Sequence, residues 1–359
     1  MPGDLAGITG ISRMRVEMAL LGFGHVGRRF ALLLDERADY LRNVHGLDPH
    51  VVAIATRRHG SAFNRNGIDL RDAVARRAAG QSLGSDGTPA DVIGELASST
   101  APVRVVLEAT TLNVTDAQPA IGHVEMALDS GCHVVTVNKG PVAFAYRRLN
   151  QFASDKGVSF LFEGAVMDGI PIFNLVRDTL PSVTLTGFRG IVNTTTQHIL
   201  MALEEGEPFS AALERMQAEG IAEADPSLDV DGWDAAAKAA ALANVLLDAE
   251  LTPHRVAREG LGANAPAAVQ RAAAAGRRLR LVVAGSRDAS GAHASVRLTE
   301  LDASDMLATL PRTANALILR TDLLDEIAIC QMRGDLTQTA YALFTDLVSV
   351  CRRVAAGIG

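Results

Sequence analysis

The sequence predicts an α/β protein in which a doubly wound parallel sheet is followed by a second α/β domain. An apolar strand near residue 15 runs directly into a glycine-rich turn and a helix, apolar strands then alternate with helices, and the pattern changes after residue 162. Alternation of strands and helices is typical of a parallel sheet that helices cover on both faces. The 359 residues are enough for two domains that each bury a core.

The first turn has the spacing that dinucleotide sites require. Residues 15–30 place Gly22-x-Gly24-x-x-Gly27 between the first strand and an amphipathic helix. Gly22 permits a tight turn, Gly24 lets a pyrophosphate approach the backbone, and Gly27 lets the helix pack on the strand. The alternative is a flavodoxin-like domain with incidental glycines. A Rossmann-type fold predicts a cofactor site at Gly22, Phe23, Gly24, His25, Val26 and Gly27, with phosphates at the helix N-terminus.

The second strand, 51–56, ends in two arginines, Arg57 and Arg58. Folds that prefer NAD usually place an aspartate or glutamate at this point, which binds the ribose hydroxyls. A guanidinium instead neutralises a 2′-phosphate. The sequence therefore favours NADP(H), with NAD(H) as the alternative cofactor and a solvated basic turn as the alternative structure.

Two later strand ends also carry candidate site residues. Strand 103–110 ends at Thr110, and strand 133–137 is followed by Asn138 and Lys139. Ligands of doubly wound sheets bind beyond the carboxyl ends of the strands, so Thr110 and Lys139 are expected to face the cofactor. A solvated lysine that opens a loop is the alternative for Lys139. The remaining expected elements of this half are one crossover helix over 72–79, a helix over 118–130 and a fifth strand over 158–162.

The remainder predicts a second α/β domain and a long C-terminal helix. Its expected elements are a loop over 163–171 followed by a helix that Pro171 starts, extended segments over 184–192 and 280–298, helices around 197–202, 208–218 and 235–248, and a helix over 337–354 with Tyr341, Leu343, Phe344 and Leu347 on its apolar side. We therefore expect a loose extension at 1–13, a dinucleotide-binding domain at 14–162, a second α/β domain at 163–336, and a C-terminal helix at 337–359 that packs on the first domain or a partner subunit.

Residues 218–238 hold the densest group of chemically active side chains. A turn-rich run with Glu223 and Asp229 leads into a helix that carries Asp234 and, four residues later, Lys238. Residues four apart share one helix face. The helix then continues without charges, as buried helices do, and charges are rarely buried without a task. The alternative is a helix cap beside an ordinary surface ion pair.

Composition is that of a cytoplasmic enzyme. No apolar run reaches the length of a membrane span, residues 1–13 lack the features of a secretory signal, and a net charge of −7 argues against a nucleic-acid partner. The three cysteines, Cys132, Cys330 and Cys351, form no CxxC or Cys/His cluster, which argues against disulfides and zinc. One class of NADP-dependent oxidoreductases with a similar architecture, the semialdehyde dehydrogenases, needs a nucleophilic cysteine. Cys132 lies at a helix-to-strand junction and is expected only to pack, which argues against that class.

The order of these motifs resembles homoserine dehydrogenase from about residue 14 to residue 350. The matching motifs are Gly22-x-Gly24-x-x-Gly27, Val137-Asn138-Lys139, residues 163–171, Gly190-Ile191-Val192-Asn193-Thr194-Thr195 and Glu223-x-Asp225-Pro226-x-x-Asp229-x-x-Gly232-x-Asp234-x-x-x-Lys238. The resemblance implies NAD(P)-dependent interconversion of L-homoserine and L-aspartate 4-semialdehyde. It also implies a homodimer, with residues 163–336 as the catalytic and dimerisation domain.

The resemblance further implies roles for individual residues. Lys238 would hydrogen-bond the reacting oxygen with Asp234 as its partner, Glu223 and Lys139 would bind the amino-acid end of the substrate, and Asp229, Thr194 and Thr195 would line the pocket. Within the family, a loop that matches 163–170 binds a monovalent cation, which implies a Na⁺ site at Glu163, Val166, Asp168 and Ile170; a plain structural loop is the alternative.

This sequence departs from the family pattern at three places. Met167 and Asp168 replace small residues, which bears on the cation site, and Ile221 replaces a usual tyrosine, which bears on the substrate pocket. Residues 332–335 replace a glycine-rich hinge, which bears on the cofactor geometry. Because the sequence ends at Gly359, no C-terminal sensing domain is expected. Another substrate, or a catalytically silent NADP sensor, remains the alternative to homoserine dehydrogenase.

Overall fold

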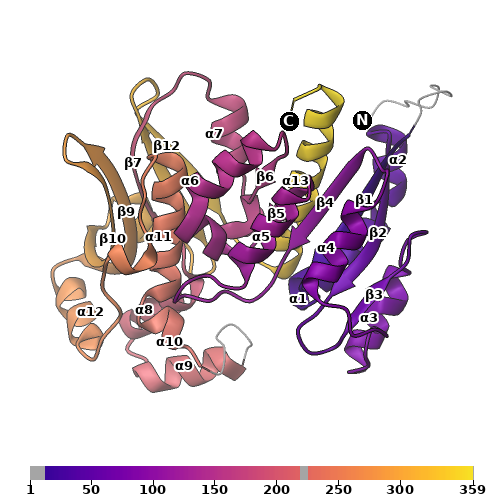
Figure 1. Ribbon diagram of the computed structural model, residues 1–359. Helices are drawn as coiled ribbons and strands as arrows, with labels where there is room; N and C mark the ends of the chain where they lie inside the picture. Colours follow the sequence, from indigo (N-terminus) through magenta and orange to yellow (C-terminus); the bar gives the residue numbers. More distant parts are fainter. Residues whose placement is uncertain (1–12, 219–224, 359) are drawn as a thin grey trace.

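The computed structural model describes residues 13–218 and 225–358, which form two six-stranded sheets with helices packed around them (Figure 1). The first sheet has the order β3-β2-β1-β4-β5-β6, and within it β2 and β3 pair antiparallel while the other neighbours are parallel. This is the predicted Rossmann-type sheet, and its strand order reverses between β1 and β4, where ligands of such sheets bind. The strands are β1 (Met14–Leu21), β2 (Leu47–Ala55), β3 (Ser61–Phe63), β4 (Val103–Glu108), β5 (His133–Thr136) and β6 (Phe160–Leu161).

Helices cover both faces of the first sheet because successive strand residues point to opposite sides. Val16, Met18 and Leu20 of β1 belong to a core shared with α1 and α13, whereas Ala19 and Leu21 belong to the core of the other face. The helices on the first face are α1 (His25–Glu36), α2 (Ala38–Val44), α3 (Leu70–Ala78) and α13 (Leu336–Ala355), and those on the second are α4 (Pro89–Ala97), α5 (Ala120–Asp129) and α6 (Lys139–Asp155).

The crossover between β3 and β4 differs from the prediction. Residues 60–99 were expected to hold one helix, but they form α3 and α4 together with β3. Thr88 caps α4 by accepting a hydrogen bond from the backbone of Asp91, whose side chain bonds the Thr88 backbone in return. Pro89 at the first helical position adds to this start signal, so the sequence did contain the information for the second helix.

The second sheet has the order β12-β11-β7-β9-β10-β8 and is largely antiparallel. The segment expected to be extended over 280–298 is a longer hairpin made by two twelve-residue strands, and two later strands extend the sheet on the other side of β7. The strands are β7 (Leu185–Ile191), β8 (Ala257–Arg258), β9 (Arg277–Asp288), β10 (Gly291–Asp302), β11 (Asn315–Thr321) and β12 (Glu326–Gln331). Strands β11 and β12 are not among the elements expected from the sequence.

The remaining helices connect the two sheets and cover the second one. They are α7 (Phe173–Thr179), α8 (Thr194–Glu204), α9 (Phe209–Ala218), α10 (Ser227–Val230), α11 (Trp233–Leu246) and α12 (Ala265–Ala274), with short 3-10 turns η1 (Glu163–Ala165), η2 (Pro253–Arg255) and η3 (Met306–Thr309). Helix α11 packs against α6 of the first sheet and against β9 and β10 of the second. Its first turn therefore lies where the two halves of the molecule meet.

The C-terminal helix α13 returns to the first sheet, where it lies beside α1 (Figure 1, yellow). Leu343, Phe344 and Leu347 are buried there as expected. Tyr341 is 50% exposed, so its assignment to the apolar side was wrong. Position 341 lies on the solvent side of the helix, and the Tyr341 ring stacks on Phe344 instead of entering the core. Residues 1–12 of the expected N-terminal extension lie outside the described residues.

Candidate active site

The glycine turn after β1 has the geometry of a dinucleotide site. Gly22 has a φ of +90°, and a Cβ there would lie 2.5 Å from the carbonyl oxygen of Ala109. A Cβ at Gly27 would lie 2.5 Å from the carbonyl oxygen of Gly22, so α1 approaches the turn too closely for any side chain. Beside Gly24, by contrast, the space is open within 4 Å. The turn therefore fits a pyrophosphate at the N-terminus of α1.

The other predicted cofactor contacts differ in what they offer. Phe23 is buried in the core, which leaves its backbone to face a ligand, whereas His25 is exposed and Val26 is half-buried. Arg57 and Arg58 are exposed just beyond β2. Partial burial and the nearby guanidinium groups of Arg77, Arg58 and Arg28 lower the pKa of His59. The end of β2 is therefore a positively charged surface, as a phosphate site requires.

Three charged side chains from two helices meet at one carboxylate. Asp234 and Lys238 lie one turn apart on α11, and Lys139 is the first residue of α6. The Lys139 Nζ lies 3.1 Å from one Asp234 carboxylate oxygen, and the Lys238 Nζ lies 3.0 Å from the other. Lys238 also donates to the carbonyl oxygen of Val192 at 2.6 Å. The predicted ion pair is therefore confirmed, and Lys139 joins it from the first sheet.

Burial and charge act in opposite directions on this cluster. Burial alone would raise the pKa of Asp234, but the ammonium groups of Lys139 and Lys238 outweigh it and hold that pKa well below the usual range. Burial alone would lower the pKa of Lys238, but the carboxylates of Asp234 and Asp168 outweigh it and raise that pKa. Both side chains are only 15% exposed. The cluster thus holds ionised groups in a partly dry site, where electrostatic interactions are strong.

Asn193 connects this cluster to a second carboxylate. Its side-chain amide donates to Asp234 at 3.0 Å and to Asp229 at 2.7 Å, while its carbonyl oxygen caps α8. Thr195 also donates to Asp229, and burial followed by repulsion from Asp234 raises the pKa of Asp229. Asn193 belongs to the motif at 190–195, but no role for it was expected from the sequence. Its position as the residue before a helix, where asparagine is a preferred cap, was the available signal.

Three further predicted residues lie apart from the cluster or beyond the described chain. The hydroxyl oxygen of Thr194 accepts a hydrogen bond from the side-chain amide of Asn315 in β11 at 3.2 Å, so it faces the second sheet. Glu223 and Ile221 lie outside the described residues. The remaining candidate on the cofactor side, Thr110, follows β4, and its carbonyl oxygen accepts from the side chain of Asn138 at 3.2 Å.

In the loop predicted to bind sodium, the carboxylate of Glu163 bonds backbone N–H groups. Glu163 accepts hydrogen bonds from the backbone N–H groups of Ile172, Phe173 and Asn174 at 2.6 to 3.0 Å, which caps the start of α7. Three N–H groups of the protein therefore already bond this carboxylate, and burial raises the pKa of Glu163 in spite of them. Among the described residues, no group of His, Cys, Asp and Glu side chains has the arrangement of a metal site.

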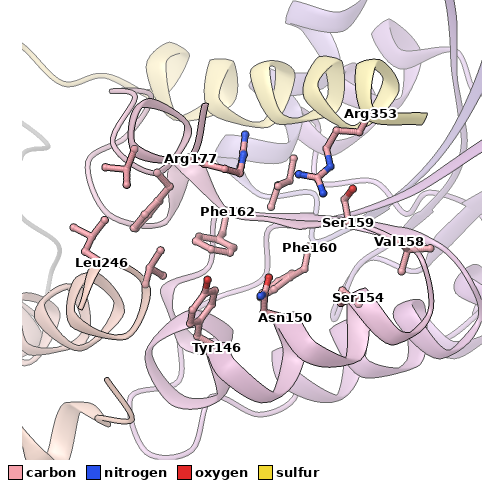
Figure 2. A pocket seen from close by; sticks show the side chains of 15 residues that line it. Tyr146, Asn150, Ser154, Val158, Ser159, Phe160, Phe162, Arg177, Leu246 and Arg353 are labelled. Carbon is pink, nitrogen blue, oxygen red and sulfur yellow. The ribbon is translucent and has the colours of Figure 1, made fainter. Parts of the chain in front are cut away.

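A cavity of about 390 Å³ lies elsewhere, between α6, β6, α7, α11 and α13 (Figure 2). Phe160 and Phe162 form its wall, and Arg177 and Arg353 lie along it. None of the predicted site residues lines this cavity. Cys132 is also remote from the cluster and fully buried, and burial raises the pKa of its thiol to about 11, so it is a packing residue as expected.

A Rossmann-type sheet with an open glycine turn, beside a buried lysine–aspartate cluster, defines a nicotinamide-nucleotide-dependent oxidoreductase. Comparison with known families agrees: the family model "Homoserine dehydrogenase" matches residues 171–348, and the model "Homoserine dehydrogenase, NAD binding domain" matches residues 22–163. The chain belongs to the homoserine dehydrogenase family.

Individual relatives match over almost the whole chain. The NAD(+)-dependent homoserine dehydrogenase of Pseudomonas canavaninivorans is 35% identical over 93% of this chain and 96% of its own length. A homoserine dehydrogenase of Methanocaldococcus jannaschii is 32% identical over 93% and 98%. Among solved structures, that of a hyperthermophilic archaeal homoserine dehydrogenase in complex with NADPH has a TM-score of 0.78 at 27% identity and covers 95% of this chain and 98% of its own.

Proposed function

We propose that this protein interconverts L-homoserine and L-aspartate 4-semialdehyde with a nicotinamide cofactor, in the biosynthesis of threonine, methionine and isoleucine. The observation that carries the proposal is the convergence of Lys139, Asp234 and Lys238 next to the carboxyl end of the first sheet. The residue before Lys139, Asn138, donates a hydrogen bond to the carbonyl oxygen of Thr110. The residue before Thr110, Ala109, contacts Gly22 of the glycine turn. The cluster therefore borders the place where a bound cofactor would end.

The residues of the cluster suit reduction of an aldehyde and the reverse oxidation. The cofactor supplies or accepts the hydride. As the carbonyl oxygen gains negative charge, the Lys238 ammonium stabilises it and donates a proton, directly or through a water molecule. Asp234 holds both ammonium groups in place, and Lys139 with Glu223 would bind the two charged ends of the amino-acid substrate.

We further propose that NADP(H) is preferred over NAD(H). Arg57, Arg58 and Arg28 support this proposal because their charge complements a 2′-phosphate. The NAD(+)-dependent relative supports the opposite preference. Steady-state assays of purified protein with each cofactor decide between them, since the ratio of kcat/KM values measures discrimination directly.

The test of the reaction follows nicotinamide absorbance with L-homoserine and with close four-carbon analogues. We expect oxidation of L-homoserine with kcat/KM well above that of each analogue. If the protein binds the cofactor but turns over none of these amino alcohols, it is a cofactor sensor or acts on another substrate.

We also propose a homodimer assembled through the region after Glu163 and the strands of the second sheet. An obligate two-fold interface buries on the order of 2,000 Å² or more, so the dimer should persist at nanomolar concentration. Light scattering that gives twice the chain mass of 37.8 kDa would support it, and a single-chain mass would exclude it.

No helix within 13–218 or 225–358 is long and apolar enough to cross a membrane, and a cytoplasmic location stays a prediction.

The sodium site stays a proposal that rests on the backbone carbonyls of Val166, Asp168 and Ile170, since the Glu163 carboxylate caps α7. Carbonyl oxygens are the hard ligands that Na⁺ accepts. A higher melting temperature in sodium chloride than in choline chloride at equal ionic strength would support the site. Equal melting temperatures in the two salts would contradict the sodium site.

A further inference from the structure

One fully buried carboxylate has no part in the chemistry above. Glu108 is the last residue of β4 and is 0% exposed. Its partners among the described residues are hydroxyl and amide donors, and none of the ion pairs between described residues includes it. Because burial of a carboxylate without a cation is costly, it raises the pKa of Glu108 even though Thr110, Thr136 and Asn138 donate to it. Such a group is retained where position matters more than stability.

The first oxygen of Glu108 holds the residue that follows the strand end. It accepts the backbone N–H of Thr110 at 2.9 Å and also the Thr110 hydroxyl, in a short contact. Ala109, between the two, contacts the glycine turn, because its carbonyl oxygen occupies the space that a Cβ on Gly22 would need. Through Thr110, Glu108 therefore fixes the backbone beside the cofactor turn.

The second oxygen of Glu108 holds the neighbouring strand. Glu108 and Thr136 are register partners in β4 and β5, and the Thr136 hydroxyl donates to Glu108 at 2.6 Å. The same hydroxyl accepts the backbone N–H of Asn138 at 2.9 Å. Asn138 in turn caps α6 by accepting from Gly140 at 2.9 Å. These bonds set the first turn of α6, from which Lys139 reaches Asp234.

We propose that Glu108 is a positioning residue that anchors the cofactor-side Thr110 and the substrate-side Lys139 to one buried point. The proposal rests on the dehydrogenase function given above. Hydride transfer requires the two reactants within a narrow distance, and a misplacement of about 1 Å costs about 10² in rate. Loss of the anchor should therefore lower kcat more than it weakens the binding of either ligand.

Two substitutions at Glu108 separate position from charge. Glutamine keeps an acceptor for both Thr110 donors, and its amide can donate to the Thr136 hydroxyl, which then accepts. Leucine has a similar size but makes none of these bonds. We expect kcat of Glu108→Gln within about threefold of wild type and kcat of Glu108→Leu lower by about 30-fold or more, as expected for a misplaced transfer geometry.

Glu204→Gln serves as the control for stability. Glu204 is also a buried carboxylate, paired with Arg280 at 2.7 Å, but it lies at the far end of α8 from the cluster. Removing its charge leaves Arg280 buried without its partner, which destabilises the fold and should leave kcat within about twofold. Thr136→Val covers the case in which Glu108→Leu does not fold, because it cuts the link to Asn138 and keeps Glu108. It should lower kcat about tenfold, since the first turn of α6 is then less well placed.

The experiment measures kcat and KM for L-homoserine, melting temperature, and the affinity for NADPH and NADH from the rise in their fluorescence on binding. Reduced kcat in Glu108→Leu and Thr136→Val, with cofactor affinity within a few-fold and Glu108→Gln near wild type, supports the proposal. It is overturned if Glu108→Leu or Thr136→Val keeps wild-type kcat, if Glu108→Gln loses as much as leucine, or if Glu204→Gln loses kcat in parallel with melting temperature. A wild-type protein that does not oxidise homoserine would overturn the proposed function instead.

Discussion

Two groups of buried carboxylates in this molecule differ in their neighbours. Asp234 has two ammonium groups within 3.1 Å, and its pKa lies well below the usual range although burial acts to raise it. Asp346 on α13 accepts from the backbone of Glu163 and from the side chain of Asn174. Burial, and then repulsion from Glu163, raise the pKa of Asp346 to about 7.

The difference shows how to distinguish a reactive group from a structural one. A strongly shifted pKa is not sufficient evidence of catalysis, since both groups have one. Asp234 also lies where two helix N-termini and the end of the first sheet meet, whereas Asp346 and Glu163 bind backbone and amide groups that join α13 to α7. Position relative to the cofactor turn, together with the neighbouring cations, is the reason we propose the active site at Asp234.

The largest effect should follow the loss of Lys238. Lys238→Ala removes the group that we propose stabilises the reacting oxygen, so we expect kcat to fall by about 10²–10⁴ with cofactor affinity within a few-fold. Lys156→Ala is the matched control, because Lys156 pairs with Asp129 on the surface at 2.8 Å. Steady-state kinetics and cofactor fluorescence measure both quantities. If Lys238→Ala retains more than about a tenth of wild-type turnover, another group acts on the oxygen.

A pH profile tests the electrostatic half of the comparison. In wild type, Asp234 and Asp168 raise the pKa of Lys238 above 10.5 against the effect of burial, so the ammonium persists through the alkaline range. In Asp234→Asn the burial effect gains weight and this pKa should fall. The ratio of variant to wild-type kcat/KM should therefore decrease between about pH 7 and about pH 10. A ratio that stays constant over this range would show that Asp234 does not set the charge of Lys238.

The sequence was sufficient for the site where short motifs encode the geometry. The glycine spacing, and the four-residue spacing of Asp234 and Lys238, each predict contacts within one turn or one helix. A further signal went unused: three of the 34 basic residues are lysines, and two of them meet at Asp234. In a chain that otherwise uses arginine, lysine marks places where a compact ammonium is needed.

Long-range pairing explains what the sequence did not predict. Strand β11 pairs with β7 across more than a hundred residues, and no local pattern specifies that partner; β12 then pairs with β11. The resemblance to the family implied that the carboxylate of Glu163 binds a cation. Its true partners are amides of the next helix, which the sequence separates from it by nine to eleven residues.

A smaller effect should follow a charge reversal at Arg57, which affects binding but not the reacting atoms. In Arg57→Asp the new carboxylate repels a 2′-phosphate and can accept from a free ribose hydroxyl, so the ratio of kcat/KM with NADP⁺ to that with NAD⁺ should fall. Arg65→Asp makes the same change in net charge at an exposed arginine that pairs with Glu95. If Arg57→Asp lowers kcat/KM equally with NADP⁺ and with NAD⁺, or no more selectively than Arg65→Asp does, Arg57 only shapes the loop.

The smallest effect on turnover should come from Asp346→Asn, at the other carboxylate group. Asp346 is 1% exposed and its partners are Glu163 and Asn174, neither of which bonds Lys139 or Lys238. The asparagine oxygen can still accept from the Glu163 backbone, while its amide faces the Asn174 amide and costs stability. We therefore expect a changed melting temperature with kcat and KM within about twofold of wild type, because surface and structural changes remote from the reacting atoms alter stability first. A loss of kcat close to that of Asp234→Asn, measured well below the melting temperature, would show that burial and a shifted pKa matter more than position.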